Sequence, residues 1–183
     1  HPWASMVRYA RTGGEAVAIA VRIARAFSGK DIILFGGYHG WHDWYLSSNI
    51  KDSQNLDKVH LSGLKPSGIP KVLKGTSFPF FYNDTKSLIS LVEKYKGKIG
   101  GIIIESIRNK PPKSDFISTL NNITSMNKIP FIIDEVSAGW RMTEGGAHKL
   151  YGINPDIAVF AKGMSNGYPM AAVIGKNNIM EAS

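Results

Sequence analysis

The sequence predicts an α/β fold with a largely parallel sheet. Short, uninterrupted apolar segments alternate with segments of helical character along the 183-residue chain. Strands of this kind are typical of sheets that helices cover on both faces, because both sides of each strand are then buried. The composition, 43% hydrophobic and 20% charged, is that of a globular protein. The length suits about one domain.

The first half of the chain contains two predicted helices and one predicted strand. Glu15–Phe27 is rich in helix formers, follows two glycines and ends before a Ser-Gly pair. Asp31–Phe35 predicts a buried strand. Asp84 is placed to cap a second helix, whose apolar positions recur at the helical period. Those positions are Leu88, Leu91, Val92 and Tyr95.

The second half continues the alternation. One further helix and four strands are predicted: Gly101–Glu105 as a strand, Asp115–Met126 as a helix, and Pro130–Asp134, Asp156–Ala161 and Met170–Gly175 as strands. Residues 46–76 interrupt the order with a long stretch rich in Ser, Lys, Asn, Gly and Pro. A connection of that length is typical of a mobile lid over a ligand, with simple disorder as the alternative.

Charge and cysteine content exclude several classes of protein. The net charge is +8, but the basic residues are scattered without a run of five, which argues against nucleic-acid binding. No apolar run approaches the roughly 20 residues of a membrane-spanning helix. The absence of cysteine excludes disulfides and thiolate metal sites and suits a cytoplasmic protein. The start at His1, without an initiator Met or a signal peptide, indicates a fragment.

A reactive side chain follows each of several predicted strands. The residues at these strand ends are Gly36–Gly40, which includes Tyr38 and His39, and then Glu105, Asp134 and Lys162. In open α/β sheets, ligands bind at the carboxyl ends of the strands. Asp134 and Lys162 are separated by about 30 residues, the span of one strand–crossover–strand unit. We therefore expect the carboxylate and the amine to emerge from neighbouring parallel strands.

Each of these side chains also has a simpler interpretation. Asp134 could be a turn residue, Lys162 a solvated lysine, and Tyr38 and His39 core aromatics with satisfied polar groups. His39 and His42 have a spacing that could hold a metal, but Gly40 between them argues against a helix. No metal site is therefore predicted.

The start of the first predicted helix adds a further group. Thr12-Gly13-Gly14-Glu15 opens that helix, where backbone N–H groups and the helix dipole favour a phosphate. Glycine lets an anion approach the backbone closely. A phosphate cradle, an aromatic face, a carboxylate and a strand-end lysine are the parts of a pyridoxal phosphate site.

Several motifs in the chain occur together in one known family. They are Arg11–Ala16 (RTGGEA), Gly37–Asp43 (GYHGWHD), Ile133–Val136 (IDEV) with Gly139–Arg141 (GWR), and Ala161–Gly163 (AKG) followed by Asn166–Pro169 (NGYP). From about Val7 to Gly175 the chain resembles the class III aminotransferases, and most closely their glutamate-1-semialdehyde aminomutase branch. The resemblance implies the three-layer, mostly parallel sheet of the large domain of fold-type I pyridoxal-phosphate enzymes.

The resemblance also assigns roles to individual residues. Lys162 would form the Schiff base with the cofactor aldehyde and move protons, and Asp134 would keep the pyridine nitrogen protonated. The other cofactor-binding residues would be Tyr38 at the ring face, Gly13, Gly14 and Glu15 at the phosphate, Glu105 and Val136 along the ring, and His39. The expected substrate is a small amino or oxo compound, and the expected complete protein is a homodimer without nucleic-acid or membrane partners.

The chain departs from the family pattern at three places. Gly14 stands where many relatives have Ser or Thr, and Ser106 stands where Pro is usual. Ile107–Pro112 also differs from the family's glycine-containing turn, so substrate preference would differ with it.

Three functions stay open: an aminotransferase (including one acting on sugars), an aminomutase, and a catalytically inactive cofactor-binding or interaction domain. Residues 1–183 would be an incomplete large domain, lacking an N-terminal segment and the C-terminal small domain and inactive alone.

Overall fold

Seven strands form a single sheet in the described part of the chain, which comprises residues 1–50, 52, 55–57, 59 and 62–183 of a computed structural model. The spatial order is β1-β7-β6-β5-β4-β2-β3. The strands are β1 (Met6–Ala10), β2 (Ile32–Gly36), β3 (Ser77–Pro79), β4 (Ile99–Glu105), β5 (Phe131–Asp134), β6 (Ile157–Phe160) and β7 (Ala171–Gly175). The helices are α1 (Gly13–Ser28), α2 (Asp43–Leu46), α3 (Thr85–Lys94), α4 (Ser114–Asn127) and α5 (Asn177–Met180).

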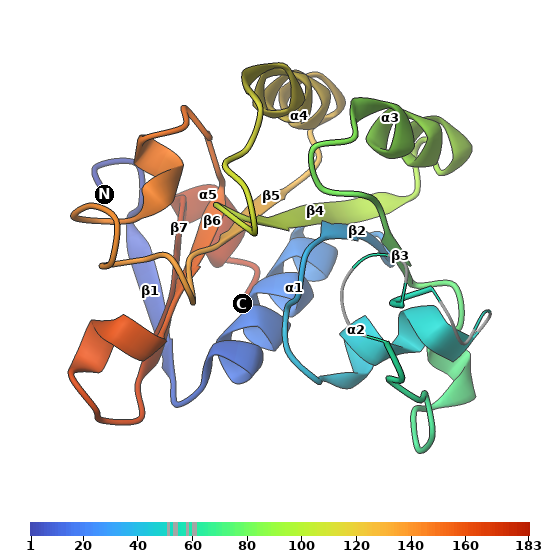
Figure 1. The fold of residues 1–183 in the computed structure, drawn as a ribbon, viewed down its shortest axis with the longest axis horizontal. Coiled ribbons are helices and arrows are strands. Elements are labelled where there is room, and N and C mark those ends of the chain that lie inside the picture. Colours follow the sequence, from blue (N-terminus) through green and yellow to red (C-terminus); the bar gives the residue numbers. More distant parts are fainter. Residues whose placement is uncertain (51, 53–54, 58, 60–61) are drawn as a thin grey trace.

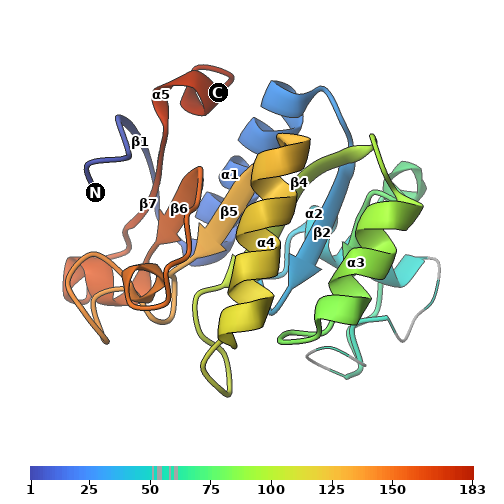
Figure 2. The ribbon, with the colours of Figure 1, turned by 90° about the horizontal axis from the view of Figure 1, so that it is seen from above.

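Helices cover both faces of the sheet, which confirms the predicted three-layer α/β fold. Figures 1 and 2 show α3 and α4 together on one face and α1 on the other. Alternate residues of each buried strand point to opposite faces. In β4, Ile103 packs in the cluster that contains α1, whereas Ile102 and Ile104 pack in the cluster that contains α3 and α4. Each apolar strand therefore contributes side chains to both hydrophobic clusters, one on each face of the sheet.

Side-chain caps set the starts of α1 and α3. The Thr12 hydroxyl accepts the Glu15 N–H (3.2 Å) at the start of α1. Gly29 ends α1 in a left-handed conformation (φ 65°) and donates its N–H to the Arg25 carbonyl. Asp84 accepts the Ser87 N–H (3.0 Å) at the start of α3, which confirms its predicted capping role.

The directions of β7 and β1 determine which segments of the chain lie at the site. Strands β2 to β6 are parallel, but β7 pairs antiparallel with β6, and β1 pairs antiparallel with β7. Strand β1 therefore runs in the same direction as β6, and the chain after Ala10 reaches the same edge as the ends of β4, β5 and β6. Strand β7 begins at this edge, so the residues before Ala171 also lie there.

The crossover between β5 and β6 contains no α-helix. Residues 135–156 contain only a short 3₁₀ helix, Ala147–Lys149. The fully buried Glu135 carboxylate organises this connection, because it accepts the N–H groups of Ala147 (3.1 Å) and His148 (2.7 Å) and the Ser106 hydroxyl (2.9 Å). A buried carboxylate with this many donors ties the connection to the end of β4.

Hydrogen bonds anchor several of the described residues of the long segment 46–76. Asn49 accepts the Leu56 N–H (3.0 Å) and donates to the Leu64 carbonyl (2.6 Å), and the hydroxyls of Ser47 and Ser77 are 2.8 Å apart. Part of this segment lies outside the described residues, and its closure over a ligand stays a prediction. In the portion of the chain that the structure describes, no helix has the length and apolar character needed to cross a membrane.

Candidate cofactor-binding site

A cavity of about 360 Å³ opens at the carboxyl edge of the parallel strands. It brings together eight of the nine predicted binding residues: Gly13, Gly14, Tyr38, His39, Glu105, Asp134, Val136 and Lys162. Asp134 ends β5, and Lys162 follows the adjacent parallel strand β6, as their spacing predicted. The cavity lining also includes residues to which the sequence analysis gave no binding role: Arg11, Ser137 and Tyr168–Met170.

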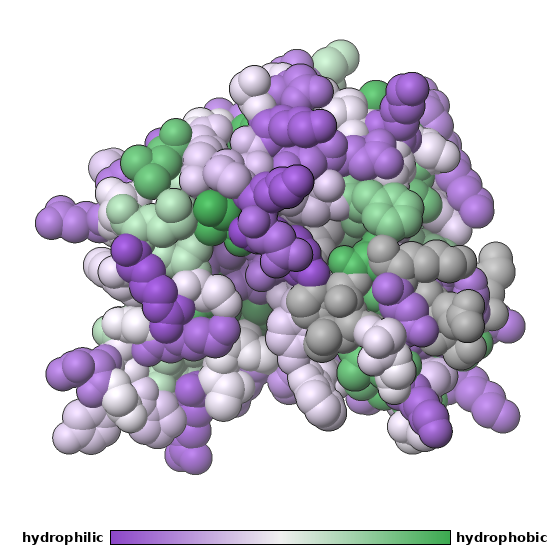
Figure 3. Space-filling model, in the orientation of Figure 1, coloured by the Kyte–Doolittle hydropathy of each residue, from purple (hydrophilic) through white to green (hydrophobic). Residues whose placement is uncertain are grey.

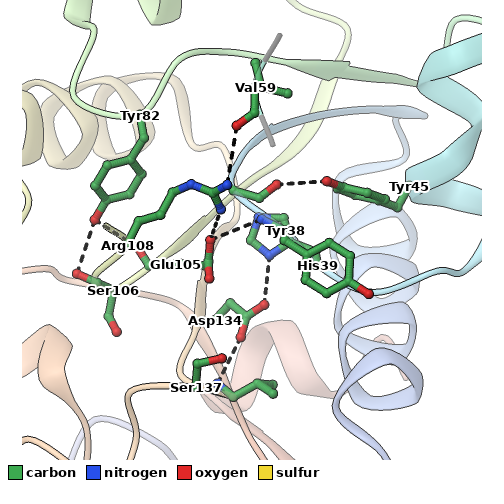
Figure 4. Close-up of polar contacts among 12 residues, drawn as sticks. Tyr38, His39, Tyr45, Val59, Tyr82, Glu105, Ser106, Arg108, Asp134 and Ser137 are labelled. Atoms are coloured by element: carbon green, nitrogen blue, oxygen red, sulfur yellow. Dashed lines mark hydrogen bonds and ion pairs between the residues drawn. The ribbon is translucent and has the colours of Figure 1, made fainter. Parts of the chain in front are cut away.

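Asp134 is buried and held in one orientation by two hydrogen bonds. Its Oδ2 lies 2.8 Å from His39 Nδ1, and its Oδ1 accepts the Val136 N–H (2.9 Å). The His39 ring packs edge to face against Phe35 and stacks on Trp44, and Figure 4 shows it directed toward the carboxylate. His39 therefore positions Asp134, a role beyond that of a lining residue.

The start of α1 lines one part of the cavity. A Cβ atom added to Gly13 would lie 2.6 Å from Val136 Cγ1, and one added to Gly14 would lie 3.1 Å from His42 Cδ2. Helix geometry leaves the N–H groups of these first residues without partners inside the helix. The two glycines thus present backbone donors at the positive end of the helix dipole, which suits an anion.

Glu15 does not line the cavity, in contrast to the predicted phosphate-binding role. Its N–H donates to the Thr12 hydroxyl, and its carboxylate accepts the Arg11 N–H (2.8 Å). This reciprocal pair resembles a capping box, in which an acidic side chain reaches back to the residues before the helix. The Thr-x-x-Glu spacing in the sequence was the signal for this structural role.

Lys162 has an unusual backbone conformation for a lysine. Its φ of 48° lies in the left-handed region, where residues other than glycine are strained by about 1–3 kcal/mol. The residue begins a 3₁₀ turn, Lys162–Ser165, directly after the extended Ala161. Its Nζ donates to the Ser137 hydroxyl (2.7 Å), so the amine is held at the cavity beside the segment that follows Asp134.

Glu105, the last residue of β4, also lines the cofactor cavity. Its Oε2 accepts the Tyr38 N–H (3.1 Å) and pairs with Arg108 (Figure 4). Burial raises the pKa of Glu105 above its ordinary value, and the His39 and Lys162 charges oppose this shift. Gly37, with a φ of 141°, is required here, because an added Cβ would lie 2.5 Å from Glu105 Oε2.

Comparison with known proteins identifies a family whose model matches nearly the whole chain. Residues 2–183 match the family model described as aminotransferase class-III. The chain is 36% identical to a 3-aminobutyryl-CoA aminotransferase from Cloacimonas acidaminovorans, over 98% of this chain and 41% of that protein. It is 40% identical to a glutamate-1-semialdehyde 2,1-aminomutase from Nitrosopumilus maritimus, over 98% of this chain and 42% of that protein. The chain thus spans less than half the length of these curated relatives.

Solved structures share the same fold. An omega-transaminase from Sphaerobacter thermophilus matches with a TM-score of 0.82 and 27% identity, over 98% of this chain and 42% of that chain. A structure described as a transaminase with PLP bound, where PLP is pyridoxal phosphate, matches with a TM-score of 0.84 and 25% identity, over 96% of this chain and 41% of that chain.

Proposed function

Because the chain belongs to the class-III aminotransferase family, we propose that it is the cofactor-binding part of a pyridoxal-phosphate enzyme that moves an amino group. The observation that carries the proposal is the meeting of a lysine amine and a buried carboxylate at one cavity. Lys162 and Asp134 come from the ends of two neighbouring parallel strands, and both line this cavity together with the start of α1.

The residues of the cavity fit pyridoxal phosphate. The backbone donors of Gly13 and Gly14 suit its phosphate, and Val136 and His42 pack against these glycines where a side chain would not fit. The Asp134 carboxylate, oriented by His39, suits a protonated ring nitrogen. The Lys162 amine suits its aldehyde, and Tyr38 supplies an aromatic wall.

The chain's own groups then have distinct tasks. When bound, pyridoxal phosphate is an electron sink that lets a C–H bond beside an amino nitrogen break. Asp134 Oδ2 holds a proton at the ring nitrogen. Lys162 Nζ takes up and returns the proton of the substrate carbon that carries the amino group, as general acid–base catalysis requires. The Ser137 hydroxyl, which accepts a hydrogen bond from Nζ, orients the amine for this transfer.

The shape of the glycine cradle leads to a prediction for cofactor affinity. Gly13→Ala should weaken pyridoxal phosphate binding by about tenfold, because Val136 must move to admit the new methyl group. Gly152→Ala is the control: Gly152 has a φ of 64° with nothing within 4 Å of an added Cβ. It should lower stability by about 1 kcal/mol without changing cofactor affinity. Absorbance titration with the cofactor measures both variants, and equal affinities would contradict the phosphate assignment.

Two reactions remain candidates within this chemistry: transfer of an amino group between two molecules, and its transfer within one molecule. The relatives support both, since their names include aminotransferases and aminomutases. The resemblance of Gly37–Ser47 and the following long segment to the aminomutase branch favours the second. A catalytically inactive domain is disfavoured by the presence of both Lys162 and Asp134.

We also propose that residues 1–183 are the central part of a large domain within a longer polypeptide. The share of the relatives that the chain spans supports this. We refer to that longer chain as the complete polypeptide and expect it to form a homodimer in the cytoplasm. The lack of cysteine is compatible with a reducing compartment.

A product assay on the complete polypeptide tests the function. Supplied with pyridoxal phosphate, it should either isomerise glutamate-1-semialdehyde without a second substrate or transfer a ¹⁵N-labelled amino group from an amine to a 2-oxo acid. Mass spectrometry of the products distinguishes the two reactions. An inactive domain would yield neither product while still binding the cofactor.

A further inference from the structure

A second cavity, of about 350 Å³, adjoins the cofactor cavity. The two share Glu105 and Ser137 in their walls. The second cavity extends away from the glycines of α1, toward Arg108, Asn109, Arg141 and Met142. A molecule whose amino group lies beside Lys162 could therefore extend past Glu105 into this space.

The walls of the second cavity carry more positive than negative charge. Arg108 and Arg141 face a single carboxylate, that of Glu105. Arg108 pairs with Glu105 and also donates to the Val59 carbonyl (3.4 Å), as Figure 4 shows. Arg141 donates to the Ser137 carbonyl, and none of the described residues forms an ion pair with it. A guanidinium has several N–H donors in a planar fork, so both arginines keep donors for a ligand.

The positive charge continues outward from this cavity. A third cavity, of about 470 Å³, shares Arg108 and Asn109 with the second and is also lined by Lys110 and Lys113. The described residues of its lining include no carboxylate. Hydrophilic side chains gather over the connection between β4 and α4 in Figure 3, which is the segment that carries these residues. An anion approaching the site from this side meets an attractive field.

We propose that Arg108 and Arg141 bind an anionic group of the substrate, a carboxylate or a phosphate, in the second cavity. This inference rests on the proposed function, because it places the substrate amino group at Lys162. The planar fork of an arginine matches both anions with paired hydrogen bonds. The cofactor phosphate does not compete for this site, since its cradle at Gly13 and Gly14 is absent from the second cavity. Glu105 orients Arg108 from the cofactor side.

Matched amines test the substrate class in the complete polypeptide loaded with pyridoxal phosphate. The probes are 4-aminobutyrate, 3-aminopropylphosphonate and the neutral 4-aminobutanamide. Arg141→Gln should lower the ratio of kcat/KM for the preferred anionic amine over the neutral amine by about tenfold or more. Arg141→Lys should lower it less, because the charge stays while the fork is lost. Which of the two anionic amines is preferred distinguishes a carboxylate from a phosphate-like group.

The control variant is Lys86→Gln, which removes the same charge from an exposed position of α3 outside the three cavities. It should leave the ratio unchanged. An equal fall of the ratio in Lys86→Gln, or no fall in Arg141→Gln, would overturn the proposal.

A binding measurement separates this proposal from the proposed function. Glutarate, an anion without an amino group, should bind the cofactor-free complete polypeptide saturably and about tenfold more weakly after Arg141→Gln. Tryptophan fluorescence can follow the binding, because Trp140 is adjacent to Arg141 and 50% exposed. Such binding without turnover of any amine would support the anion site and contradict the proposed function. Turnover without Arg141-dependent glutarate binding would support the function and overturn the anion site.

Discussion

Replacing Lys162 with alanine is expected to abolish amino transfer by the complete polypeptide and to remove the visible absorbance of its bound cofactor. The amine is the group that holds the cofactor and moves the substrate proton in the proposed function. The fold should survive, because the side chain is exposed and its described hydrogen bond is to the Ser137 hydroxyl. Absorbance spectra, product assays and thermal unfolding measure the three properties.

The matched control for this variant is Lys149→Ala. Lys149 is also exposed and also belongs to a 3₁₀ helix, but it does not line the cofactor cavity. We expect normal absorbance and activity from it. Persistent absorbance and activity in Lys162→Ala would contradict the proposed function. That result is expected if Lys162 is a solvated lysine that does not hold the cofactor.

Replacing Asp134 with asparagine should have a different effect. The cofactor should still attach through Lys162, but kcat should fall by about 10²–10³-fold, because a preorganised charge partner of the ring nitrogen is lost. The change is nearly isosteric, so the hydrogen bonds to Val136 and His39 can be kept with a change of the His39 tautomer.

Asp115→Asn removes a carboxylate from an exposed position at the start of α4 and serves as the control. It should retain full activity. If Asp134→Asn retained the kcat of the unaltered protein, Asp134 would be a structural residue of the strand end, and its assigned role would be wrong.

The meeting of Asp134 and Lys162 was predictable from the sequence for a physical reason. Both follow uninterrupted apolar runs, and such runs form neighbouring parallel strands that end at one edge. The same reasoning located Glu105 and Tyr38, and the start of α1 was visible from its glycines. These predictions needed only the apolar runs, their alternation with helices, and the spacing of the residues that follow them.

Other features depended on contacts that the sequence pattern does not express. Strand β1 alternates between half-buried and exposed residues at the sheet edge, and β3 has only three residues, so neither forms an apolar run. The reversal at β7 brings Tyr168–Met170 to the cavity, and a single strand pattern does not reveal direction. Glu15 caps the start of α1, because its N–H donates to Thr12 and its carboxylate accepts the Arg11 N–H.

Reduction with borohydride followed by peptide mapping tests the central claim most directly. Treatment of the cofactor-loaded complete polypeptide should fix pyridoxal phosphate permanently to one peptide, the one that contains Lys162. Mass spectrometry would then show the added mass on Lys162 and on no other lysine. Attachment at a different lysine, or no attachment despite bound cofactor, would contradict the assignment of this cavity as the catalytic site.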